Sequence, residues 1–207
     1  MNYSNRFFTK KYNQNRLKKY LHFIHQILSY NFNSSDNILL QKNAIQKIIK
    51  LLSLDVQQTI IEHTINNEFD YDFDLFFTQK TFFCSKCQTT LDICHTSTKI
   101  SSQIPFDISF QPAISSPWNS QRLVRSFGSI GKQVSNPFHF EEINHMNSLL
   151  IFPLNLLIIG NGYHSSTSGI FDIESIYYPQ DLLDISDWYK EIYFDGNFFK
   201  HITCDHK

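Results

Sequence analysis

The feature that most constrains the fold is an apolar run from Leu149 to Ile159, which leads directly into Gly160-Asn-Gly-Tyr-His-Ser-Ser166. Because Pro153 and Asn155 interrupt the run, it predicts either one buried strand or a bent strand pair that turns near these two residues. Glycines after a strand can take positive φ and let the backbone approach a ligand closely. The sequence therefore predicts a strand-to-helix junction at Gly160–Ser166, with at least one backbone N–H of residues 162–166 available to an anion.

The composition is that of a folded, soluble protein. The chain has 207 residues, of which 42% are hydrophobic and 18% are charged, and its formal net charge is −1. This length and apolar content allow one substantial domain, or a small helical domain joined to a second one, and exclude a disordered chain. No apolar run approaches the roughly 18–20 residues of a membrane span, and the first residues lack a signal-peptide stretch. We therefore expect a cytoplasmic location and no membrane partner.

The source of the chain is indicated by its skewed residue usage. Phe occurs 20 times, whereas Ala occurs only at positions 44 and 113 and Arg at four positions. Such usage is typical of AT-rich coding sequence and indicates a bacterial, phage or plasmid origin.

The first part of the chain, residues 1–68, predicts a three-helix unit. Apolar residues recur at helical spacing over Leu17–Leu28 and over Ile45–Leu52. Asp55 resembles an N-cap that opens a third helix through Ile65. Basic residues dominate the N-terminal helix, which predicts a solvated face. The alternatives are a nucleic-acid contact and docking of this basic end against the acidic C-terminal end.

The second part, residues 69–207, predicts a mixed α+β domain that carries the site. Short runs of aromatic and β-branched residues predict strands, and an amphipathic stretch predicts a helix with Leu123, Val124 and Phe127 toward the core. An acidic C-terminal helix and strand would close the domain. The expected strands are Phe76–Phe83, Thr89–His95 and Ile104–Phe110, and the expected helix is Asn119–Ile130. The predicted fold class is α+β, with the helical unit packed on the mixed domain.

Candidate ligand-binding residues gather at the glycine turn. The backbone of Gly160, Asn161 and Gly162 could bind phosphate, and His164 could donate to it or act as a general acid–base. Ser165 and Ser166 could donate to the same anion or cap the following helix. The alternative is an ordinary glycine turn with a serine N-cap, since the sequence matches neither a Walker A loop nor a dinucleotide fingerprint.

Two of the four arginines, Arg122 and Arg125, lie on the expected helix before the glycine turn. Their guanidinium groups would neutralise phosphate. We expect one of them within on the order of 10 Å of His164, where its charge would lower the histidine pKa and keep the ring neutral, ready to act as a base.

The order of these elements resembles the ParB/sulfiredoxin-like fold. There, a strand and a Pro-containing loop lead to a helix, and a further strand ends in a Gly-x-His turn that cradles nucleotide phosphates. Gly162 and His164 match that turn. Ser165 stands where those families have Arg, and Tyr163 stands where sulfiredoxins have the nucleophilic Cys. The resemblance implies phosphate or nucleotide binding at the turn.

The chain also resembles an uncharacterised bacterial family that combines Pro-Trp and Arg-Leu with a later Asn-Gly-Asn-His-Ser. The matching elements are Pro117-Trp118, Arg122-Leu123 and Asn161–Ser165, and Tyr163 departs from the pattern. This resemblance implies that the Trp, Arg and His positions belong to one site.

Metal ligands are suggested at two places. Cys84-Ser-Lys-Cys87 has zinc-ligand spacing, and His201 and Cys204 could complete a site with three cysteines and one histidine. We expect reduced cysteines with neither a disulfide nor zinc, and zinc is the alternative.

The second possible metal site is the pair Glu142 and His145, which are three positions apart; we expect them to lie in a solvated loop. In a nuclease, Glu141 or Glu142 would hold the metal and His164 would assist.

These residues favour a phosphate- or nucleotide-binding protein. Its enzymatic form would be a hydrolase or nuclease acting on nucleotides or nucleic acid, with a nucleotide and a divalent metal as cofactors, and with Arg122 and His164 as catalytic residues. The alternative is a non-enzymatic interaction protein, for instance a phage- or plasmid-encoded inhibitor of another protein. Its contact surface would consist of exposed aromatic residues, namely Trp118, Tyr177, Tyr178, Trp188 and Tyr189.

Overall fold

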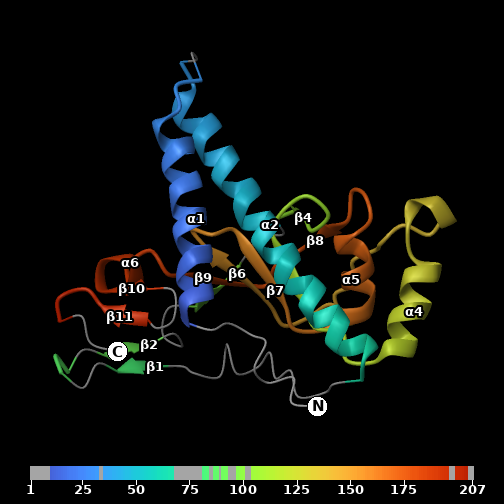
Figure 1. Cartoon of the computed structure of the whole chain (residues 1–207). Helices are drawn as coiled ribbons and strands as arrows, with labels where there is room; N and C mark the ends of the chain where they lie inside the picture. The colour runs from blue at the N-terminus through green and yellow to red at the C-terminus, as the bar shows by residue number, and fades with distance from the viewer. Residues whose placement is uncertain are drawn as a thin grey trace. The chain divides into compact units, whose positions relative to one another are not determined.

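The computed structural model describes residues 10–32, 35–67, 81–83, 86–88, 90–92, 97–100, 104–195 and 199–204. These residues form an α+β protein, in which N-terminal helices precede a mixed five-stranded sheet with further helices (Figure 1). The chain divides into two compact units. The sheet unit comprises Gln46–Thr81 and Asp92–Ile185, and the terminal unit comprises Met1–Ile45, Phe82–Leu91 and Ser186–Lys207. The sequence predicts a boundary after residue 68, whereas this division falls within a helix.

The helical part contains two helices among the described residues, α1 (Lys10–Ser29) and α2 (Asn37–Ile65), so the prediction of three helices is wrong. The expected second and third helices are one continuous helix, because no Gly or Pro interrupts it. Ser53 turns its hydroxyl inward to the Lys50 carbonyl at 2.8 Å. The carbonyl of Asp55 accepts the Thr59 hydroxyl at 3.1 Å, which places Asp55 inside the helix and not at an N-cap.

The five-stranded sheet contains parallel and antiparallel pairs. Its strand order is β3 (Ser97–Lys99), β9 (Asp181–Asp184), β6 (Ser148–Phe152), β7 (Leu156–Ile159) and β5 (Ala113–Ser115). The β6–β9 and β7–β5 pairs are parallel, and the β3–β9 and β6–β7 pairs are antiparallel. The apolar run is thus the hairpin β6–β7, which confirms the bent strand pair of the two alternatives.

Side chains of this sheet alternate between two apolar cores, as the period of two of a strand requires. In β7, Leu157 and Ile159 join one cluster, which includes Ile170 of α5 (Tyr163–Ile170). Leu156 and Ile158 join the other, which includes Ile60 of α2. The C-terminal half of α2 therefore covers one face of the sheet, and α5 covers the other.

The segment before β5 differs from expectation. Only Phe106–Asp107 forms a strand, β4, which pairs with β8 (Ile176–Tyr177), so the predicted strand Ile104–Phe110 is wrong for most of its length. The carboxylate of Asp107 accepts the Ser109 N–H at 3.0 Å and the Ser109 hydroxyl at 2.6 Å. This local side-chain turn competes with strand pairing and ends β4.

Helix α4 (Ser120–Ser129) confirms the helix expected after Pro117, and the 3-10 turn η2 (Lys132–Val134) follows it. The prediction that Leu123, Val124 and Phe127 face the core is correct only for Leu123. Val124 is 71% exposed and Phe127 is 45% exposed. Helix α4 packs mainly on α5, and Leu123 is its buried residue, so the buried stripe of the helix is narrow.

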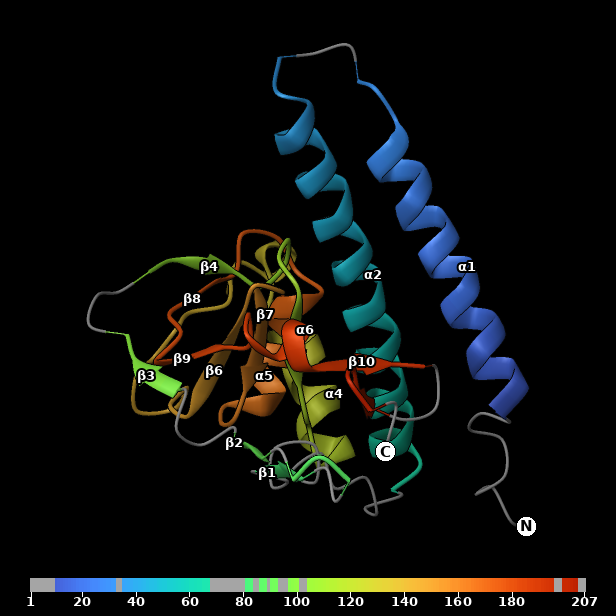
Figure 2. The ribbon, with the colours of Figure 1, turned by 90° about the vertical axis from the view of Figure 1, so that its left-hand side faces the viewer.

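The terminal unit contains α1, the first turns of α2 and short elements from distant parts of the chain. In Figure 2, α1 and the start of α2 run side by side, and the Gln41 side chain donates to the Leu28 carbonyl at 2.8 Å. The other elements are β1 (Thr81–Phe83), β2 (Thr90–Asp92), α6 (Trp188–Glu191), β10 (Ile192–Phe194) and β11 (Phe199–His201). Strands β1 and β2 fall within the expected strands Phe76–Phe83 and Thr89–His95, and the other residues of those two ranges lie outside the described residues. Among the described residues, no helix is long and apolar enough to cross a membrane.

Candidate functional site

The glycine turn is the predicted strand-to-helix junction, because β7 ends at Ile159 and α5 begins at Tyr163. Gly162 is the N-cap of α5 and has a φ of 67°, in the left-handed region that favours glycine. A Cβ atom at Gly162 would lie 2.4 Å from Cδ2 of His145, and one at Gly160 would lie 2.0 Å from the Asn147 carbonyl oxygen. Close packing on residues 144–147, and not the approach of a ligand, explains both glycines.

The amide groups of the turn are partly engaged within the protein. The Gly162 N–H donates to the side-chain oxygen of Asn161 at 2.8 Å, and the Ser166 N–H donates to the Gly162 carbonyl at 3.0 Å. The His164 and Ser165 N–H groups belong to the first turn of α5, where amides have no intrahelical acceptor. An anion-binding amide in residues 162–166 stays a prediction. Neither serine caps the helix, since the N-cap is Gly162 and no side chain caps it.

A cavity of about 650 Å³ lies between the start of α4, the glycine turn and the segment before β6. We call it the Trp118 cavity. Its lining includes Trp118, Arg122, Arg125, Asn161, Gly162, His164 and Ser165 together with Glu141 and His145. Gly160 and Ser166 do not line it, and Ser166 is fully buried. Most of the predicted site residues are therefore brought together around one cavity.

Trp118 connects two of these residues. The Arg122 guanidinium carbon lies 5.0 Å from the centroid of the indole ring, in a cation–π contact. The ring centroids of Trp118 and His164 are 5.5 Å apart and meet edge to face. The sequence predicts an arginine near His164, and the structure places Arg122 and His164 against the same indole ring.

The protonation state of His164 follows from its surroundings. Asn119 caps α4 by accepting the Arg122 N–H at 2.9 Å, and its own backbone N–H donates to Nε2 of His164 at 3.2 Å. Burial, and then the charge of Arg122, lower the pKa of His164, and the ring is therefore neutral at pH 7. Because Nε2 accepts a hydrogen bond, the proton lies on Nδ1. His164 thus offers a donor to a ligand, and its lone pair is not available for the expected role of a base.

His145 also lines the Trp118 cavity, although the sequence predicts a solvated loop there, with metal binding as the alternative. It is 3% exposed, so the prediction of a solvated loop is wrong for this residue. Its Nε2 lies 2.9 Å from Oγ of Ser165, and its Nδ1 lies 2.9 Å from the Glu141 nitrogen and 3.1 Å from the Glu141 carbonyl oxygen. Burial lowers its pKa. Phe138 and Phe140, two positions apart, pack against the imidazole, and this aromatic pair was the available signal of a buried segment.

Tyr177 packs on the same imidazole and is fully buried, with its hydroxyl donating to the His145 carbonyl at 2.6 Å. Tyr177 therefore cannot belong to an exposed aromatic contact surface, and its assignment to one is wrong.

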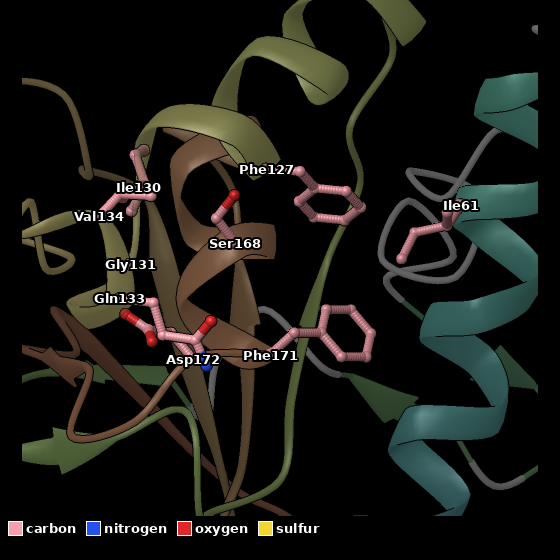
Figure 3. A pocket seen from close by; sticks show the side chains of 9 residues that line it. All are labelled: Ile61, Phe127, Ile130, Gly131, Gln133, Val134, Ser168, Phe171 and Asp172. Atoms are coloured by element: carbon pink, nitrogen blue, oxygen red, sulfur yellow. The ribbon is translucent and has the colours of Figure 1, made fainter.

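A second cavity of about 410 Å³ lies between α2, α4 and α5 and contains none of the predicted site residues. Figure 3 shows the rings of Phe127 and Phe171 turned toward Ile61 of α2, while Asp172 lies at the other side. The two ring centroids are 6.3 Å apart. This cavity is lined mainly by apolar side chains and is a poorer site for an anion.

Among the metal candidates, Cys87, His201 and Cys204 lie together in the terminal unit, with one ligand atom from each within 4.8 Å of the others. Cys84 lies outside the described residues. Within the described part of the chain, Glu141, Glu142 and His145 do not form such a group.

Comparison with known proteins gives a family but no function. No curated protein and no solved structure matches the chain. A family model described as a family of unknown function (DUF6710) matches residues 2–207. The chain therefore belongs to the family DUF6710.

Proposed function

We propose that this protein binds a phosphate-bearing ligand of the nucleotide class in the Trp118 cavity. The observation that supports the proposal most strongly is the contact of one indole ring with both Arg122 and His164, at ring distances of 5.0 and 5.5 Å. A guanidinium group held over an aromatic ring is oriented before the ligand arrives, so less side-chain entropy is lost on binding.

The charges of the lining favour an anion. Arg122 and Arg125 carry two permanent positive charges, against the one carboxylate of Glu141, which accepts a hydrogen bond from the Asn144 side chain. Arginine pairs with phosphate through two parallel hydrogen bonds, and these are stronger than bonds between neutral groups. The Nδ1–H of His164 would add a further donor.

Trp118 favours a nucleotide over inorganic phosphate. Its side chain is 49% exposed and lines the cavity beside the two arginines. Stacking of a base on an aromatic side chain stabilises binding by about 1–3 kcal/mol and requires no particular base.

The proposed relation to the ParB/sulfiredoxin-like fold agrees with this site. Strand β5, the Pro117 loop, α4 and the strand β7 that leads into the glycine turn follow in this order, with β5 in the place of the predicted strand Ile104–Phe110 and with β6 between α4 and β7. Ser165 replaces the arginine of those families, and in this proposal Arg122 and Arg125 of α4 supply the positive charge.

Hydrolysis of the bound ligand is a second candidate function. The observation that favours it is the 2.9 Å separation between Oγ of Ser165 and Nε2 of His145, which is a distance that a nucleophile and its base would have. His145 can accept the serine proton only when its Nδ1–H donates to the Glu141 carbonyl. The 2.9 Å contact with the Glu141 N–H stabilises the opposite tautomer, so binding without hydrolysis is the function that the geometry supports best.

Isothermal titration of the full chain with ATP, ADP and inorganic phosphate, with and without Mg²⁺, tests binding. We expect the nucleotides to bind more tightly than phosphate, and Arg122→Gln to weaken nucleotide binding by about 10–100-fold, since a charged hydrogen bond contributes about 1.5–3 kcal/mol. Gln121→Ala, at the exposed neighbour of Arg122, is the matched control and should keep the affinity. Absence of binding at millimolar nucleotide, or equal affinities in both variants, would contradict the proposal.

Chromatographic analysis of the same mixtures tests hydrolysis. If Ser165 is a nucleophile, Ser165→Ala stops product formation while nucleotide affinity remains. Intact nucleotide after prolonged incubation with the wild-type protein would leave binding as the function and remove the second candidate.

A further inference from the structure

The cysteine and histidine cluster of the terminal unit is independent of the Trp118 cavity. His201 ends β11, Cys204 follows in the next turn, and Cys87 lies in the connection between β1 and β2. Although 117 positions separate Cys87 from Cys204 in sequence, their sulfur atoms are 3.7 Å apart. We propose that Cys87, His201 and Cys204 bind a structural zinc ion.

The sulfur separation fits zinc. Zinc–sulfur bonds are about 2.3 Å long, and at a tetrahedral angle two such bonds place their sulfur atoms about 3.8 Å apart. A disulfide would bring the two atoms to about 2.05 Å, so the observed 3.7 Å excludes this bond between them. Ligand atoms of all three residues lie within 4.8 Å of one another, which leaves them room around one ion.

The surroundings of His201 are those of a metal ligand. The imidazole is 7% exposed, and its Nε2 lies 3.1 Å from a carboxylate oxygen of Glu191. A carboxylate at one nitrogen keeps the proton there and leaves the lone pair of the other nitrogen for a metal, as second-shell carboxylates do in zinc proteins. That other nitrogen, Nδ1, lies 2.7 Å from the Thr203 hydroxyl, a contact that the zinc ion would replace.

Charge near the cluster favours thiolates. The Lys86 ammonium group donates to the Cys204 carbonyl at 3.3 Å, directly beside the two cysteines. A positive charge at this position stabilises the deprotonated sulfur that zinc requires. Three protein ligands leave one position of the tetrahedron for a further donor, either water or another thiolate.

A zinc ion would stabilise the strands of the terminal unit. Its described strands form only the two-stranded pairs β1–β2 and β10–β11, and an isolated strand pair is marginally stable in water. An ion bound by Cys87, His201 and Cys204 would join the two pairs. The sequence favours zinc-free cysteines and gives zinc as the alternative; this proposal takes the alternative, because the C-terminal hairpin returns to Cys87.

Metal analysis of the full chain, purified without chelators, tests the site. We expect about one zinc per chain, and loss of that zinc in Cys87→Ser, Cys204→Ser and His201→Gln. His22→Gln, at an exposed position of α1, is the control and should keep the metal. Zinc-free wild-type protein, or full zinc in the variant with both cysteines replaced, would overturn the proposal.

A second measurement covers the case in which the variants do not fold. Cobalt substituted into the wild-type protein should give the thiolate-to-cobalt charge-transfer absorption of a site with two cysteines, together with the visible bands of a tetrahedral ion. Absence of charge-transfer absorption, or a Cys87–Cys204 disulfide found by mass spectrometry of the non-reduced protein, would also overturn it.

Discussion

At the scale of single residues, the site depends on atoms that hold one another in place. Asn119 caps α4 with its side chain and fixes the His164 tautomer with its backbone N–H. Gly162 allows the buried His145 to approach the turn closely. The sequence indicates which residue types gather here, but not that His145 fills the space beside Gly162.

Replacing Gly162 by alanine should lower the free energy of unfolding by at least about 2 kcal/mol. A left-handed φ of 67° disfavours a side chain, and the new Cβ would overlap Cδ2 of His145. Gly128→Ala is the control, because Gly128 lies within α4 and nothing lies within 4 Å of its added Cβ. This control should stabilise the helix by up to about 1 kcal/mol. Urea unfolding of both variants measures the difference, and equal stabilities would contradict the packing described for Gly162.

The buried His145 and the half-buried His164 should make the protein less stable in acid. Burial lowers the pKa of both His145 and His164 in the folded state, so below about pH 6.5 the unfolded chain binds protons that the folded chain does not. The free energy of unfolding should therefore fall as the pH drops from about 6.5 toward the lowered pKa values. Above about pH 6.5 both histidines are neutral in the folded and unfolded states, and no stability is lost through them.

Urea unfolding at about pH 7.5 and about pH 5.5 checks this expectation. His164→Gln should reduce the difference in stability between the two pH values, since one of the two groups is removed. A variant with the full pH dependence of the wild type would show that the His164 pKa is not lowered.

At the scale of secondary structure, local patterns predicted the elements better than their ends. The hairpin β6–β7 follows from an apolar run interrupted by a proline, and helix α4 follows from apolar periodicity after a proline, and all of these are local signals. The prediction of a helix start at Asp55 is wrong, because residue types preferred as N-caps also occur inside helices. The predicted strand Ile104–Phe110 is mostly wrong, because the turn formed by the Asp107 side chain competes with strand pairing.

Gln57 of α2 should be essential for the edge of the sheet. Its side-chain amide is fully buried, accepts the Ser115 N–H at 2.7 Å and donates to the Ser115 carbonyl at 2.8 Å. Gln57→Ala leaves two buried polar groups of β5 unpaired, and we expect a loss of about 2–4 kcal/mol in stability.

The neighbouring residue provides the control for this prediction. Gln58 points to solvent and bonds only to Glu62 at 2.9 Å among the contacts described, so Gln58→Ala should change stability by less than about 0.5 kcal/mol. Thermal or urea unfolding of the two variants measures the contrast. Similar losses in both would contradict the role of Gln57 at β5.

At the scale of the whole molecule, the sequence does not show which distant segments pair. The α+β class, with N-terminal helices before a mixed sheet, was predicted from local patterns. The combination of Phe82–Leu91 with Ser186–Lys207 in the terminal unit was not. No periodicity reports which distant segments meet, so the sequence offers Cys87, His201 and Cys204 only as an alternative zinc site, and the structure shows that these three lie together. The convergence of Trp118, Arg122 and His164 was expected from a resemblance and from element order, and the cavity places them together.

The central claim, nucleotide binding at the Trp118 cavity, is tested most directly by the fluorescence of Trp118 itself. The chain has two tryptophans, so Trp188→Phe leaves Trp118 as the sole indole reporter. Titration of this variant with ATP should change the emission in a saturable way, because the base would stack on the reporter. Adding Arg122→Gln should shift the titration to about 10–100-fold higher nucleotide, and adding Gln121→Ala should not. Emission that stays constant up to millimolar ATP, or a titration that Arg122→Gln leaves unchanged, would contradict the claim.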